Sequence, residues 1–168
     1  DYNPLGVHDN TRSVDTLGML SRTMDDQALL RAVLTHTPYR PIQTAAIGAL
    51  RIGVCRTPNW RLADEPTQEC LLRAARDLEA HGATVADFNL PDGFDEAMEG
   101  FDAVSGYEIS RTLAYEWVNY PKLLSDNMRN NRVPNGLKVT PTEYQAGLAK
   151  LRDYRQRYAA LLEDWDVL

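Results

Sequence analysis

Cysteine and histidine are scarce in this sequence, which has two cysteines and three histidines among its 168 residues. Two cysteines cannot build a framework of several disulfide bridges, so free thiols in a reducing, cytoplasmic compartment are the simplest expectation. The histidines are scattered, and no Cys or His pair has the spacing of a zinc site. The sequence therefore predicts neither a metal nor another cofactor.

Long apolar runs and an excess of positive charge are also missing. No apolar stretch is long enough to cross a bilayer, so no contact with a membrane is expected. Acidic residues outnumber basic ones by 24 to 18, which gives a formal net charge of −6. Such a chain lacks the positive footprint of a nucleic-acid binder. Only residues 128–132, MRNNR, carry local positive charge. We interpret them as a solvated loop rather than as a site that binds nucleic acid directly.

The glycine-rich motifs that accompany nucleotide binding and serine hydrolysis are absent. The turn after the apolar stretch 50–55 holds no glycine, which argues against a dinucleotide site. There is no phosphate-loop lysine motif, and Ser105-Gly106 lacks the upstream glycine of a nucleophile elbow. Taken on its own residues, the chain offers no convincing catalytic site, and no binding residue can be assigned.

Cys55 is the nucleophile that comes nearest to a catalytic pattern. It ends a predicted strand beside Arg56, which would lower its pKa, and His81 and Asp87 are conceivable partners. Since no spacing holds these groups together, a small core residue is the better interpretation of Cys55, and Cys70 is expected to be partly buried on a helix. His81 precedes a helix-ending glycine, where it suits the negative end of the helix dipole.

A strand, a helix and a second strand are predicted for residues 50–91. The segment LRIGVC at 50–55 is short and apolar, and ATVADFNLP at 83–91 alternates. The helix between them begins at Asp64 or Thr67 and ends at Gly82. Strands joined in this way are parallel and are covered on both faces. The sequence thus predicts an α/β fold whose sheet is larger than this chain can build alone.

Long helices are predicted on either side of this unit. One begins at the N-cap Thr23, with Asp26 as the acid of a capping box, and ends at the prolines within 35–41. Another covers residues 95–119, in which Gly100 and Gly106 are candidate break points.

The clearest local signal lies near the end of the chain. Residues 130–136 are predicted to be a loop, and Thr140, Pro141 and Glu143 then start a helix that runs to about residue 163. The last residues, WDVL at 165–168, look like the first half of a buried strand. We therefore expect residues 1–168 to form one domain that is incomplete at both ends.

The stretch SVDTLGMLSRTMDD closely resembles the amidase signature family. After its nucleophile region, that family carries Ser-x-Asp-(Thr, His or Gln)-x-Gly, a short apolar pair, and (Ala or Ser)-Arg-(Thr or Ser)-x-x-Asp, followed by a helix. Met19 is a departure, because proline is common at that position. The residues that match are Ser13, Asp15, Thr16, Gly18, Ser21, Arg22, Thr23 and Asp26.

Later segments are similar to the same family in the same order. They are LRIGVCRTPNW, LEAHGATVADFNLP, GYEISRTLAYEW, with Glu108 at the place of a common glutamate, and the final helix leading to DVL. The resemblance implies the amidase fold, in which a mixed sheet is covered by helices on both faces. We expect Asp15, Gly18, Arg22 and Asp26 to act as structural positions, with Asp15 and Arg22 in a partly buried polar network.

The resemblance also implies a function. Family members cleave or transfer amides with a serine nucleophile, a second serine on a cis peptide, and a lysine. Lys122, Lys138 and Lys150 lie in the wrong segments, so the catalytic residues are expected outside this chain. The implied partners are a small-molecule amide and the remainder of the same amidase fold, with a homodimer left open. The alternatives are a non-catalytic binding or scaffolding domain, and an A subunit like that of glutamyl-tRNA amidotransferase.

Overall fold

The computed structural model describes residues 6–168, and the chain divides into two compact units. Unit 1 consists of residues up to 43 together with 96–151, and unit 2 consists of 44–95 and 152–168. Each unit is described by itself below. No helix in the described part of the chain is both long and apolar enough to cross a membrane.

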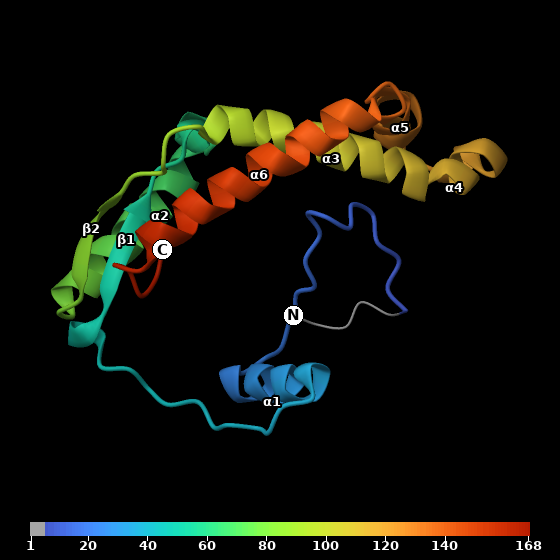
Figure 1. Cartoon of the computed structure of the whole chain (residues 1–168). Coiled ribbons are helices and arrows are strands. Elements are labelled where there is room, and N and C mark those ends of the chain that lie inside the picture. The colour runs from blue at the N-terminus through green and yellow to red at the C-terminus, as the bar shows by residue number, and fades with distance from the viewer. Residues whose placement is uncertain (1–5) are drawn as a thin grey trace. The chain divides into compact units, whose positions relative to one another are not determined.

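Unit 2 contains a strand–helix–strand motif, as predicted (Figure 1). The strands β1 (Arg51–Cys55) and β2 (Thr84–Phe88) are parallel neighbours. Between them, α2 (Glu65–Ala80) begins at Asp64, whose carboxylate accepts the Thr67 N–H at 3.0 Å. Gly82, at φ +99°, reverses the chain into β2. The local signals in the sequence were therefore sufficient to predict this motif.

The end of the chain lies along the other edge of β1. Val167 forms an isolated parallel bridge with Ile52, and its carbonyl accepts the Gly53 N–H at 2.9 Å. A Cβ on Gly53 would lie 2.9 Å from the Cβ of Phe88 and 2.5 Å from a side-chain carbon of Leu168, so a larger residue here would require its neighbours to shift. The strand predicted at the end of the sequence is present as this single bridge. Every pairing among the described residues is parallel, and the larger mixed sheet stays a prediction.

The core of unit 2 is aromatic. Phe88 is only 4% exposed, and its ring packs edge-on against Tyr158 and Trp165 at centroid distances of 6.1 and 5.9 Å. Ile52 and Val54 are buried beside it. These contacts fix the last residues of α6 and the segment after it to the sheet, since edge-on aromatic pairs add to the free energy gained from burial.

Unit 1 is helical. Its helices are α1 (Met24–Thr35), most of α3 (Phe94–Thr112), α4 (Ala114–Asn119), α5 (Val133–Gly136) and the first half of α6 (Pro141–Leu162). A π-helical turn, Met128–Arg132, precedes α5, and a short 3-10 turn occurs at Pro121–Leu123. Two further 3-10 turns, Ile47–Ala49 and Pro58–Leu62, belong to unit 2.

The capping box predicted at the start of α6 is confirmed. The Glu143 carboxylate accepts the Thr140 N–H at 2.8 Å, and Thr140 Oγ1 accepts the Glu143 N–H at 3.2 Å. The hydrogen bond from the Thr140 backbone is the largest cause that lowers the pKa of Glu143. This signal could be identified because all of its partners lie within four residues.

The prediction of a helix break at Gly100 or Gly106 was wrong, because the break falls at Leu113. Both glycines lie inside α3 and allow close contact with other helices. A Cβ on Gly147 of α6 would lie 2.8 Å from the Gly100 carbonyl oxygen, and a Cβ on Gly136 of α5 would overlap the Gly106 carbonyl. Glycine is used here to bring backbones together.

The prediction of a loop at residues 130–136 was also wrong, since this segment is helical. Its asparagines are spaced four residues apart and bond in series, with Asn131 donating to Asn127 at 3.0 Å and Asn135 donating to Asn131 at 2.6 Å. Val133 is fully buried, so tertiary packing overrides the low helix propensity of this polar sequence.

The glycine contact between α3 and α5 gives a prediction with a matched control. We expect Gly136→Ala to lower the free energy of unfolding by roughly 2–3 kcal/mol, because the added methyl group would overlap backbone. A Cβ on Gly106, by contrast, meets its nearest atom at an ordinary 3.5 Å, so Gly106→Ala is expected to be neutral or to stabilise the helix by up to about 1 kcal/mol. Urea denaturation of both variants measures the difference, and equal costs would contradict the close approach.

Candidate functional site

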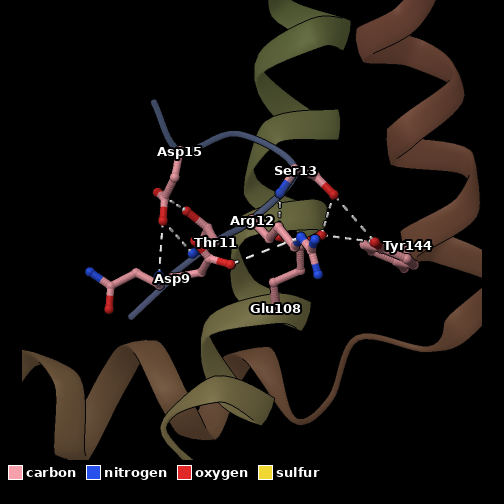
Figure 2. Close-up of polar contacts among 8 residues, drawn as sticks. Asp9, Thr11, Arg12, Ser13, Asp15, Glu108 and Tyr144 are labelled. Atoms are coloured by element: carbon pink, nitrogen blue, oxygen red, sulfur yellow. Dashed lines mark hydrogen bonds and ion pairs between the residues drawn. The ribbon is translucent and has the colours of Figure 1, made fainter. Parts of the chain in front are cut away.

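The residues that begin the family-like motif form a compact hydrogen-bonded turn. The Asp15 carboxylate accepts N–H groups from Asn10 at 2.9 Å and Thr11 at 2.8 Å, and the Thr11 hydroxyl donates to it at 2.5 Å. The Thr11 carbonyl in turn accepts the N–H groups of Val14 and Asp15. Asp9 forms a long ion pair with Arg12 at 3.9 Å. Figure 2 shows Asp15 closing this turn.

The pKa of Asp15 lies below its ordinary value. The main cause is the hydrogen bond donated by the Thr11 hydroxyl, followed by the Thr11 N–H, while partial desolvation opposes them and the Asn10 N–H assists. All three donors stabilise the ionised carboxylate. Asp15 is thus held as an anion by the turn it closes.

Glu108 on α3 tethers this turn to the helices of unit 1. Its carboxylate accepts the Ser13 N–H at 2.9 Å, the Ser13 hydroxyl, and the Tyr144 hydroxyl at 2.8 Å (Figure 2). The donors come from the turn and from α6, so three segments that are distant in sequence meet at one half-buried carboxylate. Hydrogen bonds to an ionised acceptor are about twice as strong as neutral ones.

Aromatic stacking positions Tyr144 for its hydrogen bond. Its ring stacks on Tyr107 with centroids 4.3 Å apart and planes 18° apart, and the Arg111 guanidinium lies 3.3 Å from the centre of the Tyr107 ring. Tyr107 and Glu108 are adjacent on α3, so the helix presents the ring and the carboxylate together. The stack limits the orientations open to the Tyr144 hydroxyl.

The pKa of the Tyr144 phenol is raised above its ordinary value. The hydrogen bond with Ser13 lowers it and is the largest single contribution, but the opposing contributions outweigh that bond. These are the hydrogen bond to the Glu108 carboxylate, burial, and the charges of Glu108 and Tyr107. Tyr144 therefore stays protonated and acts as a donor at neutral pH.

The hydrogen bonds among Ser13, Glu108 and Tyr144 hold the turn against α3 and α6, and we call these three residues the tether. The Ser13 hydroxyl donates to the Glu108 carboxylate. That carboxylate also accepts hydrogen bonds from the Ser13 N–H and the Tyr144 hydroxyl. A carboxylate is a weak base for a serine hydroxyl, and it is most effective as a base when its lone pairs are free. Glu108, Ser13 and Tyr144 thus explain how the turn is held, without supplying a nucleophile.

The four motif positions that were expected to be structural have different surroundings in the structure. Asp15 closes the turn, whereas Arg22 is exposed and forms no ion pair within residues 6–168, so the predicted network between these two is not found. Asp26 contributes its N–H, which Thr23 Oγ1 accepts at 3.1 Å to cap α1. Gly18 is exposed, and a Cβ there would meet nothing within 4 Å. The expected pair fails because Asp15 is already satisfied by its own turn.

The cysteines are not arranged for nucleophilic chemistry. Burial raises the pKa of the Cys55 thiol, and Arg56, which was expected to lower it, instead pairs with Asp87. His81 Nδ1 lies 2.7 Å from the Asp77 carbonyl in the last turn of its helix, as its position in the sequence suggested. Cys70 is exposed, so its predicted partial burial was wrong.

No cluster of three or more metal-ligating side chains occurs among residues 6–168. A hollow of about 270 Å³ lies beside α1, where His36 at φ +53° turns the chain back along the helix. It is lined by Ala28, Arg31, Ala32, Thr37, Pro38 and Arg40. Because this lining contains no acid, histidine or lysine that could activate the Thr37 hydroxyl, we do not regard the hollow as a catalytic centre.

Sequence reasoning missed the roles of Ser13 and Tyr144 in this site. Glu108 was noted only because a glutamate is common at the matching place, and Tyr144 lay within the predicted last helix without a role of its own. Ser13 and Glu108 are 95 residues apart, and no local pattern joins them. The adjacent Tyr107 and Glu108, opposite a tyrosine on the next long helix, were the available signal.

Comparison with known proteins gives this arrangement a family context. The sequence matches the family model described as amidase over residues 4–168. The chain belongs to the amidase family. The recognition made from the Ser13–Asp26 motif is confirmed at this level, and the finer assignment to an amidotransferase A subunit is not.

The proteins that resemble this amidase-family chain include a curated relative and several solved structures. The 2-amino-5-chloromuconic acid deaminase of Comamonas testosteroni is 30% identical over 97% of the chain and 36% of its own length. A crystal structure of an amidase is 21% identical with a TM-score of 0.80, covering 95% of the chain and 36% of that protein. Two structures titled as a vestigial protein complex revealing the origins of an s-triazine catabolic enzyme are each 19% identical, with TM-scores of 0.71 and 0.73.

These proteins are all much longer than the region they share with this chain. The two s-triazine-related structures are matched over 36% and 37% of their length, and the first two relatives over 36%. The chain therefore spans little more than a third of the relatives it matches. At 19–21% identity the structural likeness establishes the amidase fold and nothing finer.

The tether at Glu108 predicts a graded response to substitution. Tyr144→Phe removes one donor and keeps the ring stack, and we expect it to cost about 0.5–1.5 kcal/mol of stability. Glu108→Ala removes the carboxylate to which the Ser13 N–H and the Tyr144 hydroxyl donate, and it should cost roughly 1–3 kcal/mol. Hydrogen exchange should show faster exchange of the Ser13 amide in Glu108→Ala.

Glu96→Ala is the matched control, because Glu96 is an exposed acid of the same helix α3. It should leave the exchange of residues 9–15 unchanged. Unaltered Ser13 exchange in Glu108→Ala would show that the turn is held by other contacts.

The lowered pKa of Asp15 predicts how the turn responds to acid. A carboxyl whose pKa is lower in the folded state stabilises that state above its unfolded pKa, near 3.8, and this contribution is lost as pH falls through the folded value. An NMR titration of the Thr11 and Asn10 amides should therefore give a midpoint below 3.8. Asp15→Asn should abolish that transition, and a midpoint at or above the ordinary value would contradict the hydrogen-bonded turn.

Proposed function

We propose that the protein containing this chain is a hydrolase that cleaves the C–N bond of a carboxylic amide. The observation that carries the proposal is the match to the amidase family over residues 4–168. Support also comes from the ordered motif Ser13–Asp26, in which Ser13 and Asp15 form the tethered turn.

Amide hydrolysis needs an activated nucleophile and donors that stabilise the oxyanion. The family resemblance implies a serine, a second serine on a cis peptide, and a lysine for these tasks, and we place all three outside residues 1–168. In this proposal the chain supplies scaffold: Glu108 holds the turn that begins the motif, and β1 belongs to a mixed sheet covered by helices on both faces. The free edge of β2 is one place where further strands would add.

The Comamonas relative favours a second candidate function. It is named as a deaminase of 2-amino-5-chloromuconic acid. Removal of an amino group from an unsaturated carboxylic acid also breaks a C–N bond, so the same fold would act on an amino-substituted acid in place of an amide. The substrate class, rather than the fold, separates the two candidates.

The remaining alternatives concern partners. An amidotransferase A subunit would work with other chains, and the acidic balance of 24 to 18 suggests that any RNA contact would come from a partner. A homodimer and a purely binding or scaffolding role remain candidates. The free thiols of Cys55 and Cys70 support a reducing, cytoplasmic location.

An ammonia-release assay tests these candidates. The full-length protein is incubated with a panel of simple carboxylic amides, with 2-aminomuconic acid, and with aminoacylated tRNA plus an amide donor. We expect release from amides alone. Release only from the amino acid favours deamination, and a requirement for tRNA and co-purified chains favours the amidotransferase. Absence of turnover by a folded protein would leave the binding role.

A lysine variant tests where the catalytic base lies. Because we place the catalytic lysine outside this chain, Lys122→Ala, Lys138→Ala and Lys150→Ala combined should retain kcat/KM within about threefold. The Lys150–Glu99 ion pair is exposed and contributes little to stability. A loss of more than a hundredfold, with unchanged unfolding, would mean that one of these lysines takes part in the reaction.

A further inference from the structure

The hollow beside α1 is formed by the last turns of the helix and by the segment that leaves it. The chain reverses at His36, whose φ of +53° is a conformation that residues other than glycine adopt uncommonly. Residues from both sides of this reversal enclose a volume of about 270 Å³. On the helix side the lining includes Ala28 and Ala32, whose small side chains leave this room.

Two arginines are the charged groups of the hollow. Arg31 comes from the helix and Arg40 from the segment after it, and no acidic residue is part of the lining. Neither guanidinium has a hydrogen bond or an ion pair with another residue in the described part of the chain. Guanidinium ions that share one hollow repel each other, and an anion between them replaces that repulsion with attraction. The charge of the hollow therefore favours an anion over a neutral ligand or a cation.

Prolines restrict the backbone that carries Arg40. Pro38 has a fixed φ, and Pro41 confines the residue before it, which is Arg40, to extended conformations. A ligand that binds to Arg40 therefore pays little for ordering this backbone, and such ordering before binding raises affinity.

The C-terminal end of α1 is the feature of the hollow that disfavours an anion, because free carbonyl groups there carry partial negative charge. Two of these carbonyls are occupied, since Val33 accepts the His36 N–H at 3.3 Å and Ala32 accepts the Thr37 N–H at 3.0 Å. The helix dipole also acts only near its own last turn and is screened by salt. Charge-assisted hydrogen bonds from two guanidinium groups outweigh this remaining repulsion.

The hydroxyl groups near the hollow narrow the class of ligand. Thr35 donates its hydroxyl proton to the Arg31 carbonyl at 2.7 Å, so the 2.8 Å bond between Thr35 and Thr37 must be donated by Thr37. The Thr37 hydroxyl has no second proton to donate. The side-chain donors that remain for a ligand are the guanidinium N–H groups, whose planar fork matches the paired oxygens of a carboxylate or a phosphate.

We propose that the hollow beside α1 binds a small anion with a carboxylate or phosphate group, held between the Arg31 and Arg40 guanidinium groups. Its 270 Å³ lies below the range of sites for drug-sized ligands, about 300–1,000 Å³, so the anion is a small molecule. This inference goes beyond the proposed function, because it concerns the binding of an anion and not the cleavage of a C–N bond.

Calorimetric titration of the full-length protein tests the site. Succinate and inorganic phosphate are added in separate experiments at constant ionic strength, and the tighter of the two identifies the preferred group. We expect saturable binding of at least one of them, with a dissociation constant of roughly 0.1–10 mM. Arg31→Gln and Arg40→Gln should each weaken that binding about tenfold or more, because each removes charge-assisted hydrogen bonds.

Arg61→Gln is the matched control, because it removes one exposed positive charge from a residue that does not line the hollow. It should leave the affinity within about twofold, since exposed charges far from a site are screened. Absence of saturable binding of both anions overturns the proposal. Equal weakening by Arg61→Gln also overturns it, because the effect would then come from net charge alone.

Arginine modification gives the same answer if a glutamine variant does not fold. The unmodified full-length protein is reacted with phenylglyoxal, with and without succinate or phosphate, and peptide mass spectrometry gives the rate at each arginine. The bound anion should slow the modification of Arg31 and Arg40 but not of Arg61, and unchanged rates at the first two overturn the proposal. Because neither experiment measures turnover, an inactive protein that binds the anion would contradict the proposed function alone.

Discussion

The close approach of α3 to the helices that follow it is the constraint on which the candidate site depends. It is made by glycine pairs, with Gly100 against Gly147 and Gly106 against Gly136. A Cβ on Gly136 would overlap a backbone oxygen of α3, and a Cβ on Gly147 would lie 2.8 Å from another, so a side chain at either position would force the backbones apart. Because the backbones touch, the Tyr144 ring on α6 reaches Tyr107, and the Tyr144 hydroxyl reaches Glu108. The packing of these backbones therefore positions the polar groups.

The features of this fold that could be predicted are those whose partners are close in sequence. The α2 cap at Asp64, the box at Thr140 and Glu143, and the reversal at Gly82 each involve neighbours within four residues. The errors arise where distant segments decide the outcome. Glycine in a helical pattern indicates either a break or a close contact, and only the position of the other helix separates the two.

The same distinction explains what was predicted of the site. Asp15 was expected to pair with Arg22, seven residues away, but donors only four and five residues away satisfy it first. The carboxylate of Glu108 was found through resemblance alone, since its donors lie 36 and 95 residues away. Hydrogen-bonding capacity can be counted from a sequence, but the partners cannot be identified until the chain is folded.

The motif from Ser13 to Asp26 divides into residues that have hydrogen-bond partners within 6–168 and residues that are exposed. Ser13, Asp15 and Ser21 are each held by hydrogen bonds, and Thr23 caps α1. Gly18 and Arg22 are exposed, and Leu20 lies between them in full contact with solvent. An unpaired guanidinium costs little in water, but a fully exposed leucine beside an open glycine serves no local purpose. The bonded half of the motif thus holds the chain in place, whereas the exposed half makes no contact that fixes it among residues 6–168.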